Sequence, residues 1–123
     1  MKILTIAVRL LLGLVFVVFG LNAFLHFIKQ PPPSGQAAAF AGAMFMSGYF
    51  YVVAICQIAG GALLLIGRFV ALGLTILGPV IVNIVLFHVF LAPEGLPLAS
   101  AVLVLEAFLI WSYRERFGPI FKP

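Results

Sequence analysis

The chain has 123 residues, of which 65% are hydrophobic and only 8% are charged. A water-soluble domain carries roughly a quarter of charged residues, so this composition excludes a soluble fold, and the apolar content excludes disorder. The net charge of +4 comes from Lys and Arg residues spread along the chain without forming a patch, so we expect no nucleic-acid partner. We therefore expect residues 1–123 to form one membrane domain, with the lipid bilayer as its main partner.

Four apolar segments are long enough to cross a membrane, which takes about 20 residues in a helix. They are residues 3–27, 49–66, 69–91 and 97–113. Backbone groups cannot stay unpaired in lipid, so each segment is predicted to be helical, and the continuous apolar runs lack the alternation of a membrane β-barrel. The first run is too long for a signal peptide, so we interpret it as a retained helix. The predicted fold is all-α, an integral membrane four-helix bundle.

The connections are marked by Pro and Gly. Residues 28–48 are predicted to form a loop around the prolines at 31–33, followed by a short helix over 36–47 with Ser34 as its N-cap. This short extra helix lies at the membrane interface or tips into the second span at Gly48. Gly67 and Arg68 form a short turn that makes spans two and three antiparallel, and Pro97 suits the first turn of the fourth span.

The basic residues predict the orientation. With both termini in the cytoplasm (N-in, C-in), the inner side holds Lys2, Arg68, Arg114, Arg116 and Lys122, and the outer side holds Lys29. Residues 114–123 are then a cytoplasmic tail. The aromatic residues at 49, 51, 111 and 113 lie near span ends, as interfacial aromatic residues do.

An ordered set of short segments resembles the DoxX-like family. The set begins with RLLLGLVF at 9–16 and FGLN at 19–22, and continues through 48–50, 60–65, 79–84, 87–88, 93–99 and 111–114. The resemblance covers essentially the whole chain. It implies a bacterial inner-membrane protein of four helices, associated with membrane redox systems, since the family is named after a subunit of a thiosulfate:quinone oxidoreductase. It supplies no established catalytic residue.

Two ionisable residues lie inside predicted spans, where each is costly unless it has a partner. Arg9 lies about 9 Å into the first helix and Glu106 roughly 12 Å into the fourth, both measured from the cytoplasmic side. Because these depths match, we predict a buried ion pair between Arg9 and Glu106. The alternatives are that Arg9 reaches the headgroups and that Glu106 is protonated or solvated.

Small residues form two helix faces. Gly13 and Gly20 share one face of the first helix with Arg9, and Gly60 and Gly61 share a face of the second helix with Gln57. Such faces allow close helix packing in lipid. Pro79 follows Gly78 in the middle of the third span and is expected to kink it.

The outer halves of the spans hold a second polar set. We predict an outer polar pocket, suited to a quinone headgroup or a small ligand, formed by Asn22, His26, Gln57, Asn83 and His88. The two histidines could instead ligate a haem or a metal, but each lies near a helix end and no third ligand accompanies them, so we expect no haem and no metal site. The remaining alternative is that they are helix-end histidines bonded to backbone carbonyls or lipid headgroups.

The sequence is consistent with two functions. One is an accessory or anchoring subunit of a quinone-linked redox system, with redox proteins as partners. The alternative is a non-enzymatic membrane scaffold that binds a lipid, a small ligand or a partner, including a second copy of the chain. Cys56 is the sole cysteine, so no Cys pair can form, and no nucleophile–base, phosphate-loop or paired-carboxylate pattern is present. We do not expect the chain to be an enzyme by itself.

Overall fold

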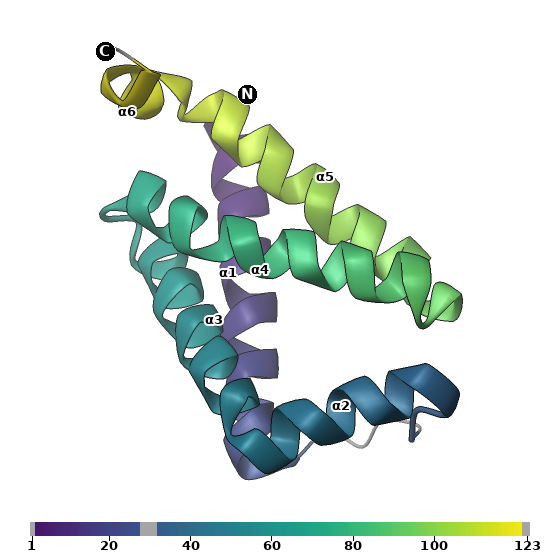
Figure 1. Ribbon diagram of the computed structural model, residues 1–123. Coiled ribbons are helices and arrows are strands. Elements are labelled where there is room, and N and C mark those ends of the chain that lie inside the picture. The colour runs from purple at the N-terminus through teal and green to yellow at the C-terminus, as the bar shows by residue number, and fades with distance from the viewer. Residues whose placement is uncertain (1, 28–31, 122–123) are drawn as a thin grey trace.

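The computed structural model describes residues 2–27 and 32–121, and every regular element in these ranges is a helix. In chain order the elements are α1 (Lys2–Leu25), α2 (Gly35–Ser47), α3 (Tyr49–Ile66), α4 (Val70–Phe90), the 3-10 turn η1 (Pro93–Gly95), α5 (Leu96–Ser112), α6 (Arg114–Phe117) and the 3-10 turn η2 (Gly118–Phe121) (Figure 1). Residues 28–31 of the predicted 28–48 loop and short helix, which include Lys29, lie outside the described residues, as does Lys122.

Four of these segments are long and apolar enough to cross a membrane: α1, α3, α4, and α5 together with η1. They match the predicted spans, and α2 is the predicted short helix. Ser34 is the N-cap of α2, as expected, although its side chain makes no capping hydrogen bond. Pro97 stands in the first turn of α5, as its lack of an N–H favours. The sequence therefore predicts the four long helices and α2 with their approximate bounds, but not the short helix α6, which lies in the predicted tail.

The helices form two antiparallel pairs. Figure 1 shows α1 beside α3, and α5 returning beside α4 in a pair that crosses the first. The α2 helix lies at the end of the α1–α3 pair that is remote from the two termini (Figure 1). Gly48 joins α2 to α3 with a φ of 79°, a left-handed conformation that glycine adopts at little cost and that turns the chain sharply there.

Glycines allow the helices to approach closely, as the two small-residue faces predict. A Cβ atom on Gly60 of α3 would lie 3.2 Å from the carbonyl oxygen of Gly73 in α4, and one on Gly20 of α1 would lie 3.0 Å from the carbonyl oxygen of Ala54 in α3. The α3 helix thus contacts α1 on one side and α4 on the other. Close backbone packing of this kind is how helices associate in lipid.

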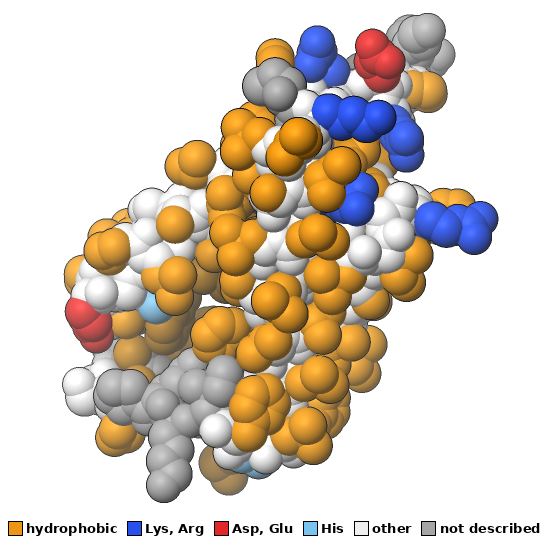
Figure 2. Space-filling model, turned by 180° about the vertical axis from the view of Figure 1, so that it is seen from behind, with side chains coloured by type: hydrophobic (Ala, Val, Ile, Leu, Met, Phe, Trp, Pro, Cys, Tyr) orange, Lys and Arg blue, Asp and Glu red, His pale blue; other side chains and the backbone are white. Residues whose placement is uncertain are grey.

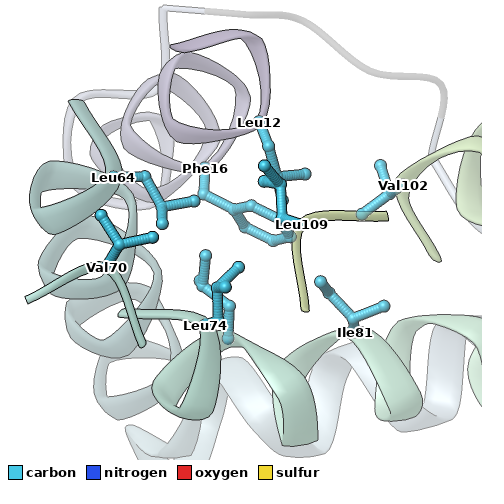
Figure 3. Packing of buried hydrophobic residues seen from close by; sticks show 9 residues of the cluster. Leu12, Phe16, Leu64, Val70, Leu74, Ile81, Val102 and Leu109 are labelled. Atoms are coloured by element: carbon cyan, nitrogen blue, oxygen red, sulfur yellow. The ribbon is translucent and has the colours of Figure 1, made fainter. Parts of the chain in front are cut away.

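The core lies where the two pairs cross. Its buried side chains come from four helices and are Leu12, Phe16, Leu64, Val70, Leu74, Leu77, Ile81, Val102 and Leu109 (Figure 3). Large apolar side chains also cover much of the outer surface (Figure 2), among them Leu14, Val52 and Val104, each more than half exposed. A surface this apolar is suited to lipid and not to water.

The charged side chains are placed differently. In Figure 2 the Lys and Arg side chains gather at the end of the molecule where the termini lie. Lys2 begins α1, Arg68 lies in the α3–α4 turn, and Arg114 and Arg116 lie in α6. The described basic residues that the sequence assigns to one side, Lys2, Arg68, Arg114 and Arg116, are thus found at one end of the fold.

Candidate functional site

A cavity of about 540 Å³ lies between α2, the first half of α3 and the second half of α4. Its volume falls within the range of small-molecule sites, roughly 300–1,000 Å³. The α2 helix closes it at the end remote from the termini. The lining residues are Phe40, Ala41, Ala43, Met44, Phe45, Ser47, Tyr49, Phe50, Val53, Gln57, Val80, Asn83, Ile84, Phe87 and His88.

Helical spacing explains why these side chains share one cavity. Phe50, Val53 and Gln57 are three and four residues apart on α3, so they lie on one helix face. On α4 the positions 80, 84 and 87 follow the same rule, and on α2 the positions 40, 44 and 47 do so. Each helix therefore presents one continuous stripe to the cavity.

Aromatic rings form part of its wall on all three helices. Phe45 of α2 stacks on Phe50 of α3 with 4.4 Å between the ring centroids. Phe40 of α2 contacts Phe87 of α4 at 5.4 Å, and Phe87 in turn meets the His88 ring edge-on at 5.2 Å. These contacts join α2 to both neighbouring helices and supply flat apolar surfaces for a planar ligand.

Five of the described lining residues carry an uncharged polar group: Ser47, Tyr49, Gln57, Asn83 and His88. Asn83 donates from Nδ2 to the carbonyl oxygen of Pro79 at 2.8 Å, which leaves its Oδ1 as an acceptor. His88 Nδ1 lies 3.0 Å from the carbonyl oxygen of Ala92, which can only accept, so Nδ1 carries the proton and Nε2 is the acceptor. Among the described residues that line the cavity, none is Lys, Arg, Asp or Glu.

The predicted outer pocket is therefore only partly assembled. Gln57, Asn83 and His88 line the cavity, whereas Asn22 and His26 do not. His26 is exposed just beyond the end of α1, with a φ of 52° and its backbone N–H bonded to Asn22 O. Among the described residues, no three His, Cys, Asp or Glu side chains are grouped as a metal site would need.

The predicted ion pair is not made. Arg9 donates from Nη1 to the Tyr113 hydroxyl at 3.4 Å, whereas both carboxyl oxygens of Glu106 are buried with no hydrogen-bond partner. The two residues share a depth, but Arg9 faces the ends of α3 and α5 and Glu106 faces α4. The prediction fails because depth along a helix does not fix the direction of a side chain around it.

Glu106 faces the proline of α4. The residue is 3% exposed, and a Cβ atom on Gly78 would lie 3.7 Å from its Oε2. The helix runs unbroken through Pro79, which has no N–H to offer the carbonyl of Thr75. Glu106 thus lies beside the weakest part of the α4 hydrogen-bond ladder, outside the cavity lining.

The α2 side chains are the part of the site that the sequence prediction lacks. Phe40, Met44 and Phe45 stand on the predicted short helix, and the spacing of Phe40 and Met44 already places them on one face. Two sequence features together indicate that this helix forms a cavity wall. It has an apolar face, and it is an interfacial helix joined to the second span at Gly48.

Comparison with known proteins adds a relative. The chain is 34% identical over 122 residues to "Uncharacterized protein YwoB" of Bacillus subtilis strain 168, a match that covers 93% of this chain and 79% of that protein. The chain belongs to the YwoB family. No family model matches it, and no solved structure matches it.

The match to YwoB spans nearly the whole chain, so it takes in helices from both antiparallel pairs as well as α2. Family membership therefore applies to the helical unit as a whole and not to one segment of it. The name of this relative assigns no ligand and no reaction.

Proposed function

We propose that this protein is a membrane protein that binds a small, uncharged and mainly apolar molecule with a polar head, of the quinone class, in the α2–α3–α4 cavity. The observation that carries the proposal is the cavity itself, which combines a volume of about 540 Å³, aromatic walls and neutral polar groups. Ligand sites in proteins have this make-up, with a few polar groups that fix orientation.

The polar groups suit the head of a quinone or quinol. The Gln57 amide donates to a carbonyl oxygen, while Asn83 Oδ1 and His88 Nε2 accept from a hydroxyl. The aromatic rings of α2 and α3 offer faces for a planar ring. The described part of the wall carries no charged side chain, so it favours a neutral ligand over a phosphorylated one. The resemblance to the DoxX-like family favours a quinone among the remaining choices.

The same resemblance supports a role beside a redox enzyme. We propose that the protein lies in the bacterial inner membrane with both termini in the cytoplasm, and serves as an accessory or anchoring subunit of a quinone-linked system. The basic residues gathered at the end with the termini support the orientation (Figure 2). The alternative is a scaffold that binds lipid or a small ligand without a redox partner.

Photoaffinity labelling tests the ligand class. The purified protein in detergent is irradiated with an azido derivative of a short-chain ubiquinone, and labelled peptides are mapped by mass spectrometry. We expect label on residues 40–57 and 80–88, which contain the cavity wall. Decylubiquinone should remove the label, and decanol should not.

A matched pair of variants supplies the control. Ala43→Trp fills the cavity, whereas Ala107→Trp makes the same change at an exposed position of α5 outside it. Labelling should be lost in the first variant and kept in the second. Equal labelling of both variants would overturn the cavity as the site, and equal competition by decanol would favour the lipid-binding alternative.

Mild solubilisation tests the redox association separately. A dehydrogenase or a sulfur-metabolism enzyme that co-purifies with the tagged protein supports the accessory role. Recovery of a homo-oligomer alone contradicts that role and leaves ligand binding unaffected.

A further inference from the structure

A second cavity, of about 410 Å³, lies at the opposite end of the molecule, between the start of α1 and the junction of α5 with α6. The described residues that line it are Lys2, Thr5, Ile6, Arg9, Trp111, Ser112, Tyr113 and Arg114. None of the lining residues is acidic, and three of them carry a positive charge. Like charges that share a small space repel one another, so this arrangement favours an anion.

Arg114 is held in place beside the cavity. Its Nη1 donates to the carbonyl oxygen of Trp111 at 2.8 Å, and its guanidinium lies over the Trp111 ring, with Cζ 4.5 Å from the centroid. These two contacts fix the plane of the guanidinium and leave its other N–H groups to face outward. A fixed guanidinium fork suits the oxygens of a phosphate group.

Arg9 is held in place by the α3–α4 turn and by Tyr113. Its guanidinium lies against Gly67 in the α3–α4 turn, where a Cβ atom would come within 3.1 Å of Cζ, and Nη1 reaches the Tyr113 hydroxyl. Gly67 has a φ of 80°, so glycine is favoured there on conformational grounds as well. The turn between the second and third spans thus orients Arg9.

Two polar atoms of the cavity-lining residues are buried without a partner. They are Nε of Arg9 and Oγ of Ser112. A buried donor left unsatisfied costs about 1–3 kcal/mol, and more when the group is charged. Both atoms are buried, so the groups that meet a ligand in the cavity are the exposed ones, the remaining N–H groups of Arg114 and the ammonium group of Lys2.

We propose that this cavity binds the phosphate of an anionic phospholipid headgroup. The surroundings favour a lipid over free phosphate, because Trp111 is 52% exposed and Ile6 38% exposed, so apolar surface continues from the cavity along the spans. Basic pockets between spans bind anionic headgroups in this way. The inference is independent of the ligand in the α2–α3–α4 cavity.

Native mass spectrometry tests the proposal on the full chain. The protein is reconstituted in nanodiscs that contain phosphatidylglycerol and phosphatidylcholine, released from them, and scored for retained lipid. A parallel sample receives inorganic phosphate in phosphatidylcholine alone. We expect the wild type to retain phosphatidylglycerol in preference to phosphatidylcholine and to show no phosphate adduct.

Variants assign the binding to these residues. Arg114→Gln and Arg9→Gln should each weaken phosphatidylglycerol retention by about fivefold to tenfold, the effect of one cation at a headgroup. Arg68→Gln is the matched control, since Arg68 is exposed in the α3–α4 turn and does not line the cavity. Arg114 is exposed as well, so Arg114→Gln remains informative should Arg9→Gln fail to fold.

Three outcomes are decisive. Loss of phosphatidylglycerol in the Arg114 and Arg9 variants, with retention in the Arg68 variant, supports the site. Equal loss in all three variants overturns it, because only general surface charge is then at work. Binding of inorganic phosphate that displaces phosphatidylglycerol overturns the lipid as the ligand.

Discussion

Gly13 of α1 and Gly61 of α3 face each other backbone to backbone. A Cβ atom added to either residue would lie 2.8 Å from the carbonyl oxygen of the other. Neither obstacle is a flexible side chain, so a larger residue can be accommodated only if the helices move apart. In lipid the packing of the backbones is itself a source of helix association, so this contact fixes the α1–α3 pair.

We therefore predict that Gly61→Ala destabilises the protein, by about 1–3 kcal/mol as for other overpacked sites. The measurement is the apparent melting temperature in detergent. Gly42→Ala in α2 is the control, since a Cβ atom there has no neighbour within 4 Å, and alanine at that site should leave stability unchanged or raise it. A Gly61→Ala protein as stable as the wild type would show that the helices are less tightly apposed.

A second prediction concerns Glu106. Because neither carboxyl oxygen has a partner, Glu106→Gln breaks no interaction, and the melting temperature should stay within the error of the wild type. Glu106→Leu removes a buried polar group and should raise stability, by about 1–3 kcal/mol. A fall in melting temperature for Glu106→Gln, larger than for Glu94→Gln at an exposed position, would point to an ion pair after all.

The Arg9 and Glu106 result shows which features the sequence can predict. The spans follow from hydropathy and from Gly and Pro at their ends, and the close-packed glycines follow from their spacing on one face. Both are properties of a single helix. The direction in which Arg9 points depends on the Gly67 turn and on Tyr113, which lie far from it in the sequence.

The crossing of the helix pairs and the placement of α2 also depend on contacts between residues that lie far apart in the sequence. The crossing brings Gln57 and His88 into one cavity and leaves Asn22 and His26 outside it. No periodicity within α1 or α4 encodes this relationship, because it is set by how the glycines of α3 contact two neighbours at once. The sequence therefore shows which polar residues lie at the same depth along the spans, but not which of them line one cavity.

A third prediction tests the polar groups of the α2–α3–α4 cavity. Gln57→Leu nearly preserves the side-chain volume but removes the amide donor, so the affinity for decylubiquinone should fall about fivefold to tenfold, the effect of one hydrogen bond. Decanol should remain unable to displace the photolabel from this variant. Leu63→Gln is the control, because it changes the polarity of the same helix at a position outside the cavity lining. Unaltered quinone affinity in Gln57→Leu would mean that this amide does not contact the ligand.

The last prediction concerns the contact between His88 and Gly95. The His88 ring lies directly against Gly95 in η1, where a Cβ atom would overlap the ring. The φ of Gly95 is −92°, which any residue adopts, so an effect of Gly95→Ala must come from the displaced ring and not from backbone strain. We expect loss of the bond from His88 Nδ1 to Ala92, a destabilisation of about 1 kcal/mol, and weaker photolabelling of residues 80–88.

A double-mutant cycle decides whether the effect passes through the ring. His88→Ala removes the obstacle, so adding Gly95→Ala to it should cost little further stability, and the two changes should be strongly non-additive. Gly118→Ala, at a position with no neighbour within 4 Å of the new Cβ atom, provides the baseline. Additive losses from His88→Ala and Gly95→Ala would show that η1 tolerates the methyl group poorly for a reason other than the imidazole, and that the ring position does not depend on Gly95.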